Sequence, residues 1–229
     1  MIENLTRLKN KIQHLEVMNQ CLPNAVHLLA VSKTKSVSEI EEAIAAEQFS
    51  FGENYIQEAI EKIPPLNKKF SNLEWHYLGK IQKNKIKDLV QYFDWVQTIE
   101  DVRTAEKLNT ACEKINKKIN VCLQVNVSCE VQKSGAKLNE APELARYIVE
   151  KCPNLCLRGL MAIGLATQDK EALKVLFHQL RCCYEGLKVA YVSIDTLSMG
   201  MSADMALAIE CGSTMVRIGS AIFGERVKA

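Results

Sequence analysis

Short apolar segments alternate with longer amphipathic segments along almost the whole chain of 229 residues. The short segments have the length of buried strands and lie at 27–32, 48–53, 73–79, 95–99, 119–127, 157–164, 193–200 and 214–224. Helical patterns lie between them, at 36–47, 54–63, 81–93, 101–115, 141–152, 169–187 and 202–212. Strands that alternate with helices pair in parallel, and eight such units favour a closed (β/α)8 TIM barrel over an open sheet.

Residues 2–20 predict an extra helix before the first strand, which we expect to cover the place left without a helix after the eighth strand. We expect the helix at 54–63 to end at Pro64 and Pro65, and Ser202 to cap the helix at 202–212. Neither a linker nor a low-complexity segment divides the chain, so we expect a single domain over 1–229. The last predicted strand ends close to Ala229, and we expect no second domain after it.

Composition excludes several classes of protein. The net charge of +2 gives little attraction to nucleic acid, and the lysines at 80, 83, 85 and 87 suit the solvated face of a helix. No apolar run reaches the roughly 20 residues of a membrane span, and the charged N-terminus is unlike a signal peptide. Nine cysteines without a Cys-x-x-Cys pair predict buried thiols in a reducing cytoplasm, with no disulfide framework and no metal site.

Lys33 is the first candidate for chemistry. It follows the apolar run 28–31 after a single residue, Ser32, at the strand end that a barrel uses for function. A lysine chosen at random at a strand end would reach solvent. In a buried barrel mouth, however, the charged form is disfavoured, and a neutral amine can attack a carbonyl carbon and form a Schiff base. Lys35, two residues further on, is expected to be solvated.

Two glycine-containing turns predict a phosphate site. "SMGMS" follows the seventh strand and contains Ser198 and Gly200; "RIGSA" follows the eighth strand and contains Gly219 and Ser220. The loops after these two strands form the usual phosphate site of the barrel. Each turn alone is a weak signal, because glycine is common in turns, but together they lie at the two expected strands. A Schiff-base lysine beside a phosphate site indicates a phosphorylated aldehyde, either pyridoxal phosphate or a sugar phosphate.

Arg217 bears on that choice, because it lies two residues before Gly219 and is expected to point into the barrel mouth. It could instead form an internal salt bridge with Glu210 or Asp195. An arginine that faces a pyridine nitrogen keeps that nitrogen unprotonated, since two adjacent cations repel each other. The pyridine ring would then be a weaker electron sink for amino-acid chemistry.

The segments that carry these residues resemble one family closely. "LLAVSKTK", "FGENYIQE", "EWHYLGKIQKNK", "LRGLMAIG", "DTLSMGMSADM" and "GSTMVRIGSAIFG" are similar, in combination and in order, to the pyridoxal phosphate homeostasis family. The resemblance extends from about residue 4 to residue 226. It implies the alanine-racemase-like barrel of fold type III, with pyridoxal phosphate as cofactor and Lys33 as the Schiff-base lysine.

The resemblance also implies contacts for the other site residues. Phosphate contacts would come from Ser198, Gly200, Gly219 and Ser220, and Arg217 would lie near the pyridine nitrogen. Asn54, His76 and Met161 would lie around the cofactor. Family members bind pyridoxal phosphate without established catalysis and influence vitamin B6 pools in the cytoplasm, so the resemblance implies a binding protein, with apo-enzymes that use the cofactor as partners.

Other functions stay open at this point. An amino-acid racemase would need a base on each face of the substrate, and only Lys33 offers one. A Schiff-base aldolase would need a second ionisable group beside the lysine. We expect a monomer, because an open barrel mouth needs no second copy.

Overall fold

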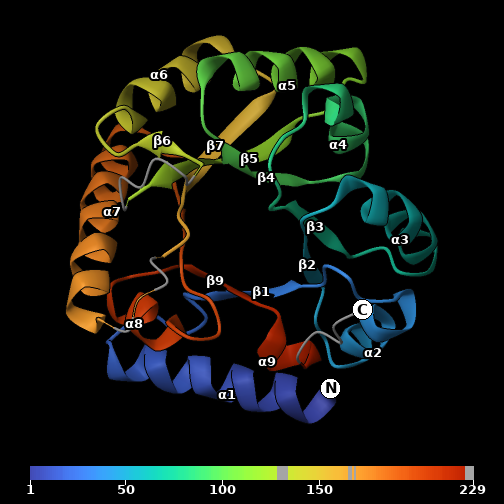
Figure 1. Ribbon diagram of the computed structural model, residues 1–229, viewed down its shortest axis with the longest axis vertical. Helices are drawn as coiled ribbons and strands as arrows, with labels where there is room; N and C mark the ends of the chain where they lie inside the picture. Colours follow the sequence, from blue (N-terminus) through green and yellow to red (C-terminus); the bar gives the residue numbers. More distant parts are fainter. Residues whose placement is uncertain (128–133, 165–166, 168, 225–229) are drawn as a thin grey trace.

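The computed structural model describes residues 1–127, 134–164, 167 and 169–224. Within these ranges one sheet contains nine strands, and eight of them close into a barrel in which every pairing is parallel. The barrel strands are β1 (His27–Val31), β2 (Ser50–Glu53), β3 (Glu74–Tyr77), β4 (Trp95–Ile99), β5 (Ile119–Asn126), β7 (Leu155–Met161), β8 (Thr196–Ser198) and β9 (Met215–Ile218). Pairing of β9 with β1 closes the ring that Figure 1 shows end-on. The predicted barrel is confirmed.

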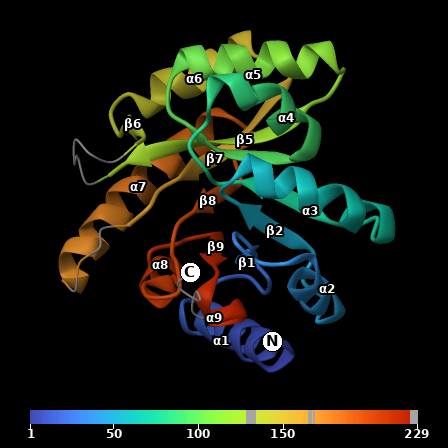
Figure 2. The same ribbon diagram turned by 45° about the vertical axis from the view of Figure 1, so that its right-hand side comes forward.

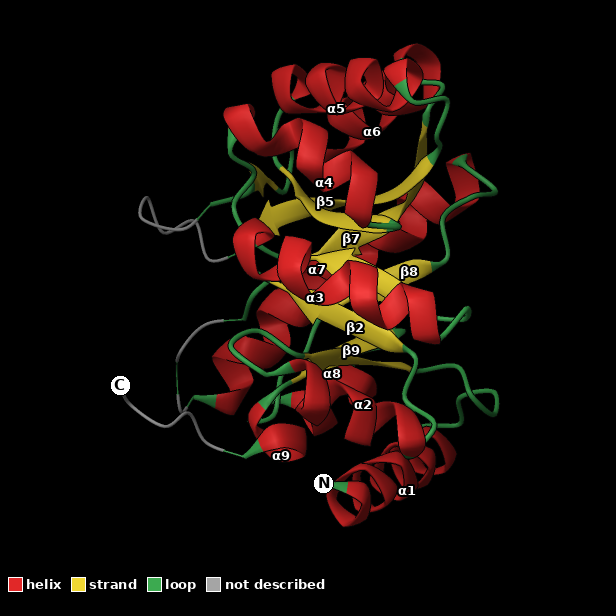
Figure 3. Ribbon diagram, turned by 90° about the vertical axis from the view of Figure 1, so that its right-hand side faces the viewer, coloured by secondary structure: helices red, strands yellow, loops and turns green. Residues whose placement is uncertain are grey.

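Helices cover the outside of the ring, as the side view in Figure 3 shows. They are α2 (Val37–Ala45), α3 (Ile56–Lys69), α4 (Ile86–Tyr92), α5 (Val102–Lys114), α6 (Ala141–Lys151), α7 (Lys170–Ala190) and α8 (Met205–Glu210), with a 3-10 turn, η1 (Lys83–Lys85), before α4. Each buries an apolar stripe against the strands, as in α2, where Ile40, Ala43 and Ile44 face inward. None of the helices in the described ranges is both long and apolar enough to cross a membrane.

The N-terminal helix α1 (Ile2–Met18) is present as predicted. It packs against α2, α8 and the short helix α9 (Ser220–Phe223), and so covers the barrel beside β9 and β1 (Figure 2). Leu5, Leu8 and Ile12 on one face of α1 are buried in this contact. The side chain of Glu16 accepts a hydrogen bond of 2.8 Å from the backbone N–H of Val26, which ties the end of α1 to the start of β1.

Three local predictions were wrong. The helix predicted to stop at Pro64 continues through Pro64 and Pro65 to Lys69, because Ile63 and Leu66 bury their side chains and hold the segment in place. The predicted strand 214–224 divides at Gly219, whose carbonyl accepts the N–H groups of Ile222 and Phe223 and so begins α9.

The third concerns Ser202, which does not cap a helix. Asp204 accepts a hydrogen bond from the backbone N–H of Met201, which closes a turn and delays the start of α8 until Met205. A two-residue strand, β6 (Ala136–Lys137), pairs in parallel with the end of β5 and was not predicted from the sequence. These differences lie outside the barrel ring and leave its topology unchanged.

Candidate functional site

A cavity of about 480 Å³ opens at the carboxyl ends of the barrel strands. Its wall comes from the ends of β1, β7 and β9 and from the loops that follow β1, β2, β3, β7, β8 and β9. The lining residues are Val31, Lys33, Thr34, Lys35, Asn54, Leu78, Met161, Ile163, Met201, Ser202, Ala203, Arg217, Gly219, Ser220, Phe223 and Gly224. The volume is in the range of small-molecule binding sites.

Charge is distributed unevenly over this wall. Lys33, Lys35 and Arg217 line it, whereas the described lining residues include no aspartate, glutamate, histidine, cysteine or tyrosine. A site with this balance of charge favours an anionic ligand. The remaining wall is mainly apolar, which suits a flat ring between aliphatic side chains.

Lys33 stands at the second position of a β-turn that leaves β1. The N–H of Lys35 donates to the carbonyl of Ser32 over 3.0 Å and closes the turn. Lys33 is half-buried and lines the cavity. The expectation that Lys35 is merely solvated was wrong, since its ammonium donates to the carbonyl of Phe223 at 3.2 Å and pairs with Glu39 at the same distance.

Hydroxyl groups from two loops meet on one side of the cavity. The hydroxyl of Ser220 donates to that of Ser202 over 3.2 Å, and Gly219 lies beside them. A Cβ atom at Gly219 would lie 3.2 Å from the carbonyl oxygen of Val31, so glycine keeps this part of the wall open. Ser202 was missed as a lining residue at the sequence level, because its position suggested the cap of α8.

Arg217 is buried on β9 and held by two hydrogen bonds. Its guanidinium donates to the hydroxyl of Ser198 and to the carbonyl of Ala162, each over 2.8 Å. Burial lowers the pKa of Arg217 to about 10, which leaves it charged at neutral pH. The alternative salt bridge to Glu210 or Asp195 does not form, because these carboxylates pair with Lys174 and Arg158.

A chain of hydrogen bonds runs from Arg217 through the barrel interior to Glu74, the first residue of β3. The hydroxyl of Ser198 donates to Gln97 Oε1 over 2.7 Å, and Gln97 Nε2 lies 2.9 Å from His76 Nδ1. His76 Nε2 lies 2.8 Å from Glu74 Oε1. Burial lowers the pKa of His76, which favours neutral imidazole. A neutral ring with its proton on Nε2 matches every donor in this chain to an acceptor.

The nine predicted site residues therefore divide into two groups. Those that line the cavity are Lys33, Asn54, Met161, Arg217, Gly219 and Ser220. Ser198, His76 and Gly200 are not among the lining residues: Ser198 and His76 belong to the interior chain behind Arg217. Gly200 lies under α8, where a Cβ atom would meet Ala208 Cβ at 2.6 Å. Gln97, which joins Ser198 to His76, was missed at the sequence level.

Asn54 carries a polar atom without a partner in the described structure. Its Nδ2 donates weakly, over 3.5 Å, to the carbonyl of Leu78, while its Oδ1 is buried and accepts no hydrogen bond. A buried acceptor of this kind is costly unless a ligand or water satisfies it. Its place in the cavity wall fits a ligand that carries a hydrogen-bond donor.

Known proteins resemble this chain in sequence over almost its whole length. The family model for the N-terminal domain of alanine racemase matches residues 4–227. The pyridoxal phosphate homeostasis protein of Pasteurella multocida is 48% identical over 226 residues, which cover 98% of this chain and 97% of the relative. The chain belongs to the pyridoxal phosphate homeostasis protein family.

Solved structures agree with this membership. The family protein PipY of Synechococcus elongatus, solved with pyridoxal phosphate bound, superposes with a TM-score of 0.81 at 32% identity and covers 97% of this chain and 99% of its own. Alanine racemase of Clostridium difficile superposes with a TM-score of 0.75 at 21% identity. That match covers 99% of this chain but 58% of the racemase, and it shows a shared barrel fold only.

Proposed function

We propose that this protein binds pyridoxal phosphate in the cavity at the barrel mouth, holds it as a Schiff base on Lys33, and serves the intracellular homeostasis of vitamin B6. The observation that carries the proposal is the cavity wall, whose described residues bring together three cations and two facing serine hydroxyls without any carboxylate. Such a wall suits a phosphorylated aldehyde. The bound pyridoxal phosphate in PipY supports the same ligand.

The cofactor would supply an aldehyde, and this chain would supply the amine. Condensation forms a C–N bond between Lys33 and the aldehyde carbon, and the aldehyde oxygen leaves as water. Ser220 and Gly219 are proposed to receive the phosphate together with Ser202, whose hydroxyl faces Ser220. Met161 would supply an apolar contact to the ring.

Two polar groups would complete the binding site. The unpartnered Oδ1 of Asn54 would accept a hydrogen bond from the ligand or from a water bound with it. Arg217 would face the ring nitrogen and, as a buried cation, keep it unprotonated. Ser198 and His76 would act through Arg217, whose position they help to hold.

Binding rather than catalysis is proposed because the cavity offers few groups that can move a proton. Racemisation needs a base on each face of the substrate carbon. Besides Lys33, the described wall offers only Lys35, which is engaged by Glu39 and Phe223, and Arg217, which stays charged. The curated relatives are named for homeostasis of the cofactor, which supports the same conclusion.

A spectrum tests the proposed binding. The purified protein mixed with pyridoxal phosphate should develop a visible absorbance band that borohydride reduction fixes to the chain. Lys33→Ala should abolish the band, whereas the exposed Lys83→Ala serves as a control and should keep it. A normal band in Lys33→Ala would show that another lysine holds the cofactor.

Two further measurements separate a binding protein from a racemase. Addition of L-alanine or L-serine to the loaded protein should leave the optical activity of the amino acid unchanged. The loaded protein should reactivate an apo-enzyme that depends on pyridoxal phosphate. Racemisation of either amino acid would favour the enzyme instead.

We further propose that the protein acts as a monomer in the cytoplasm. The lining residues named above already supply an amine, serine hydroxyls and a guanidinium, so the proposed binding asks for no residue of a second copy. Eight of the nine cysteines lie in the described ranges, and all eight are free thiols, in keeping with a reducing compartment. Cys129 lies outside the described residues.

A further inference from the structure

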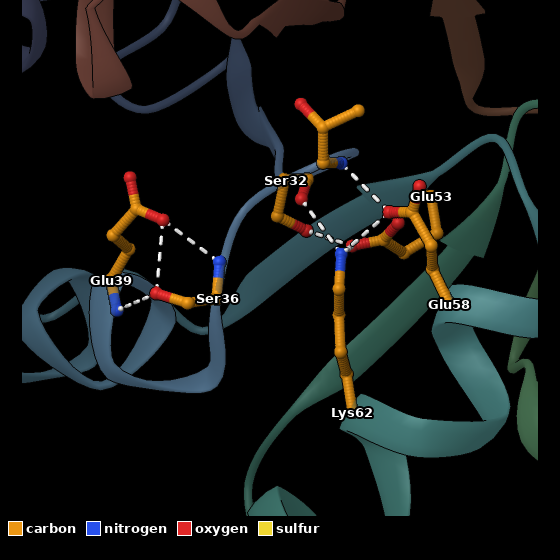
Figure 4. Close-up of polar contacts among 7 residues, drawn as sticks. Ser32, Ser36, Glu39, Glu53, Glu58 and Lys62 are labelled. Atoms are coloured by element: carbon orange, nitrogen blue, oxygen red, sulfur yellow. Dashed lines mark hydrogen bonds and ion pairs between the residues drawn. The ribbon is translucent and has the colours of Figure 1, made fainter. Parts of the chain in front are cut away.

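A buried cluster of charges lies directly behind the turn that carries Lys33. Its centre is the ammonium of Lys62 on α3, which donates to Glu58 Oε2 over 2.8 Å, to Glu53 Oε1 over 3.2 Å and to the carbonyl of Ser32 over 3.2 Å. Figure 4 shows these contacts converging on Lys62. An ammonium has three hydrogens, and each has an acceptor here, so Lys62 is fully satisfied although it is buried.

The cluster holds the chain on both sides of Lys33. On one side, the hydroxyl of Ser32 donates to Glu53 Oε1 over 2.7 Å, and the carbonyl of Ser32 accepts from Lys62. On the other side, the backbone N–H of Thr34 donates to Glu58 Oε2 over 2.7 Å. Both neighbours of Lys33 are therefore fixed by charged groups from β2 and α3.

The turn needs such support because its backbone is strained. Thr34 has a φ of 65°, in the left-handed region that a β-branched residue rarely adopts. The third position of a turn with positive φ is usually glycine. A strained conformation persists only where the surroundings impose it, and the hydrogen bond from Thr34 to Glu58 is a contact that does so.

Stability alone accounts poorly for the cluster. A buried ion pair usually gains little over an apolar replacement, because both charges lose their hydration. Glu53 is fully buried, and burial raises its pKa against the opposing effects of Lys62 and Ser32. The contacts that the three charged side chains make to the backbone go to Ser32 and Thr34, the two neighbours of Lys33.

We propose that Lys62, with Glu53 and Glu58, is the positioning device that fixes the Lys33 turn and directs the Lys33 amine into the cavity. The proposal rests on the function proposed above, in which Lys33 forms the covalent bond. Lys62 is a positioning residue in this account and does not touch the ligand.

Lys62→Met tests the proposal, since methionine keeps much of the length of the side chain and removes its three donors. Lys69→Met is the matched control: Lys69 lies on the same helix and pairs with Glu41 at 3.0 Å, but its side chain is 58% exposed. Lys62→Arg keeps the charge and the donors and should restore most of the behaviour of the wild type.

The first readout needs no cofactor. Amide hydrogen exchange of the peptide that contains Thr34 and Lys35 should be at least about tenfold faster in Lys62→Met and unchanged in Lys69→Met. The second readout is the rate at which the visible band forms with pyridoxal phosphate. It should fall about tenfold or more in Lys62→Met, because a displaced amine meets the aldehyde less often in a reactive geometry.

The outcomes are distinguishable. Unchanged exchange and an unchanged rate in a folded Lys62→Met protein would overturn the positioning role, as would an equal loss in Lys69→Met. If the wild type forms no band at all while Lys62→Met still speeds amide exchange in the turn, the proposed function fails. The role of Lys62 in fixing the turn then stands. Should Lys62→Met not fold, Glu58→Gln removes one charge of the cluster, and unchanged exchange and rate in that variant would contradict the proposal.

Discussion

Arg217 shows how one side chain joins the cavity to the barrel interior. Its guanidinium satisfies the hydroxyl of Ser198 and the carbonyl of Ala162, both of which are buried. Loss of the guanidinium would leave both acceptors without this donor, and an unsatisfied buried polar group costs about 1–3 kcal/mol.

Arg217→Met is therefore expected to lower the free energy of unfolding by about 2 kcal/mol, measured by urea denaturation. Arg146→Met on the exposed face of α6 is the control, because Arg146 pairs with Glu143 and Glu150 only at the surface. It should change stability little. Equal effects of the two substitutions would contradict the structural role assigned to Arg217.

At the scale of single residues, side chains near the carboxyl end of a strand were easier to predict from the sequence than side chains deeper inside the ring. Lys33 and Arg217 could be placed at the mouth because apolar runs fixed where β1 and β9 end. Ser198 and His76 point into the barrel, and strand alternation alone does not say whether such a side chain reaches the mouth. Gln97, a buried polar residue within the otherwise mostly apolar "WVQTI", was a signal that could have indicated the interior chain.

Among the elements, the turn between β8 and α8 depends on glycine. Gly200 has a φ of 97°, and a Cβ atom there would lie 2.6 Å from Ala208 Cβ. Backbone strain and overpacking act together at this position, each costing about 1–3 kcal/mol.

Gly200→Ala should thus lower the free energy of unfolding by about 2–4 kcal/mol, and it should weaken binding of pyridoxal phosphate through movement of the Ser202 loop. Gly186→Ala within α7 is the matched substitution, since nothing lies within 4 Å of its Cβ position. Alanine favours a helix over glycine, so this variant should be as stable as the wild type or slightly more stable. Thermal unfolding of both variants checks the contrast.

The type of an element, helix or strand, was predictable where hydrophobic periodicity was strong. The residue at which an element begins or ends was not. The continuation of α3 through Pro64 and Pro65 depends on the burial of Ile63 and Leu66, which is a tertiary effect. The division at Gly219 depends on hydrogen bonds to one carbonyl. The two residues of β6 pair only because the end of β5 lies beside them. Local sequence contains none of this information.

Across the whole molecule, the buried polar chain along the barrel interior makes stability depend on pH. Burial lowers the pKa of His76 below its usual 6.5, so the folded protein takes up this proton at lower pH than the unfolded chain. The stability that neutral His76 contributes is complete above pH 6.5, the pKa of the unfolded chain, and is lost as the pH falls below that value. Burial opposes ionisation of Glu74, but its contacts with His76 outweigh this and lower its pKa to about 2, so Glu74 stays charged throughout.

The free energy of unfolding should accordingly fall between about pH 7.5 and pH 5.5 in the wild type. His76→Gln should be less stable than the wild type at the upper end of this range, because the chain from Gln97 to Glu74 is broken, yet its stability should fall less with pH. Parallel pH profiles for the two proteins would show that His76 does not titrate in this way.

The barrel itself was predictable as a whole, because eight strand–helix units leave few other closed arrangements. The alternation of strands and helices predicts the number and order of the strands. That order alone places the carboxyl ends of β1, β8 and β9 beside one another. The cluster around Lys62 was not predictable, since Glu53 and Lys62 are ordinary charged residues until β2 and α3 bring them beneath the Lys33 turn.

The most direct test of the covalent site is a peptide map of the loaded protein after reduction with borohydride. Mass spectrometry should find the pyridoxyl group on the peptide that contains Lys33. A pyridoxyl group on any other lysine, with the Lys33 peptide unmodified, would contradict the account.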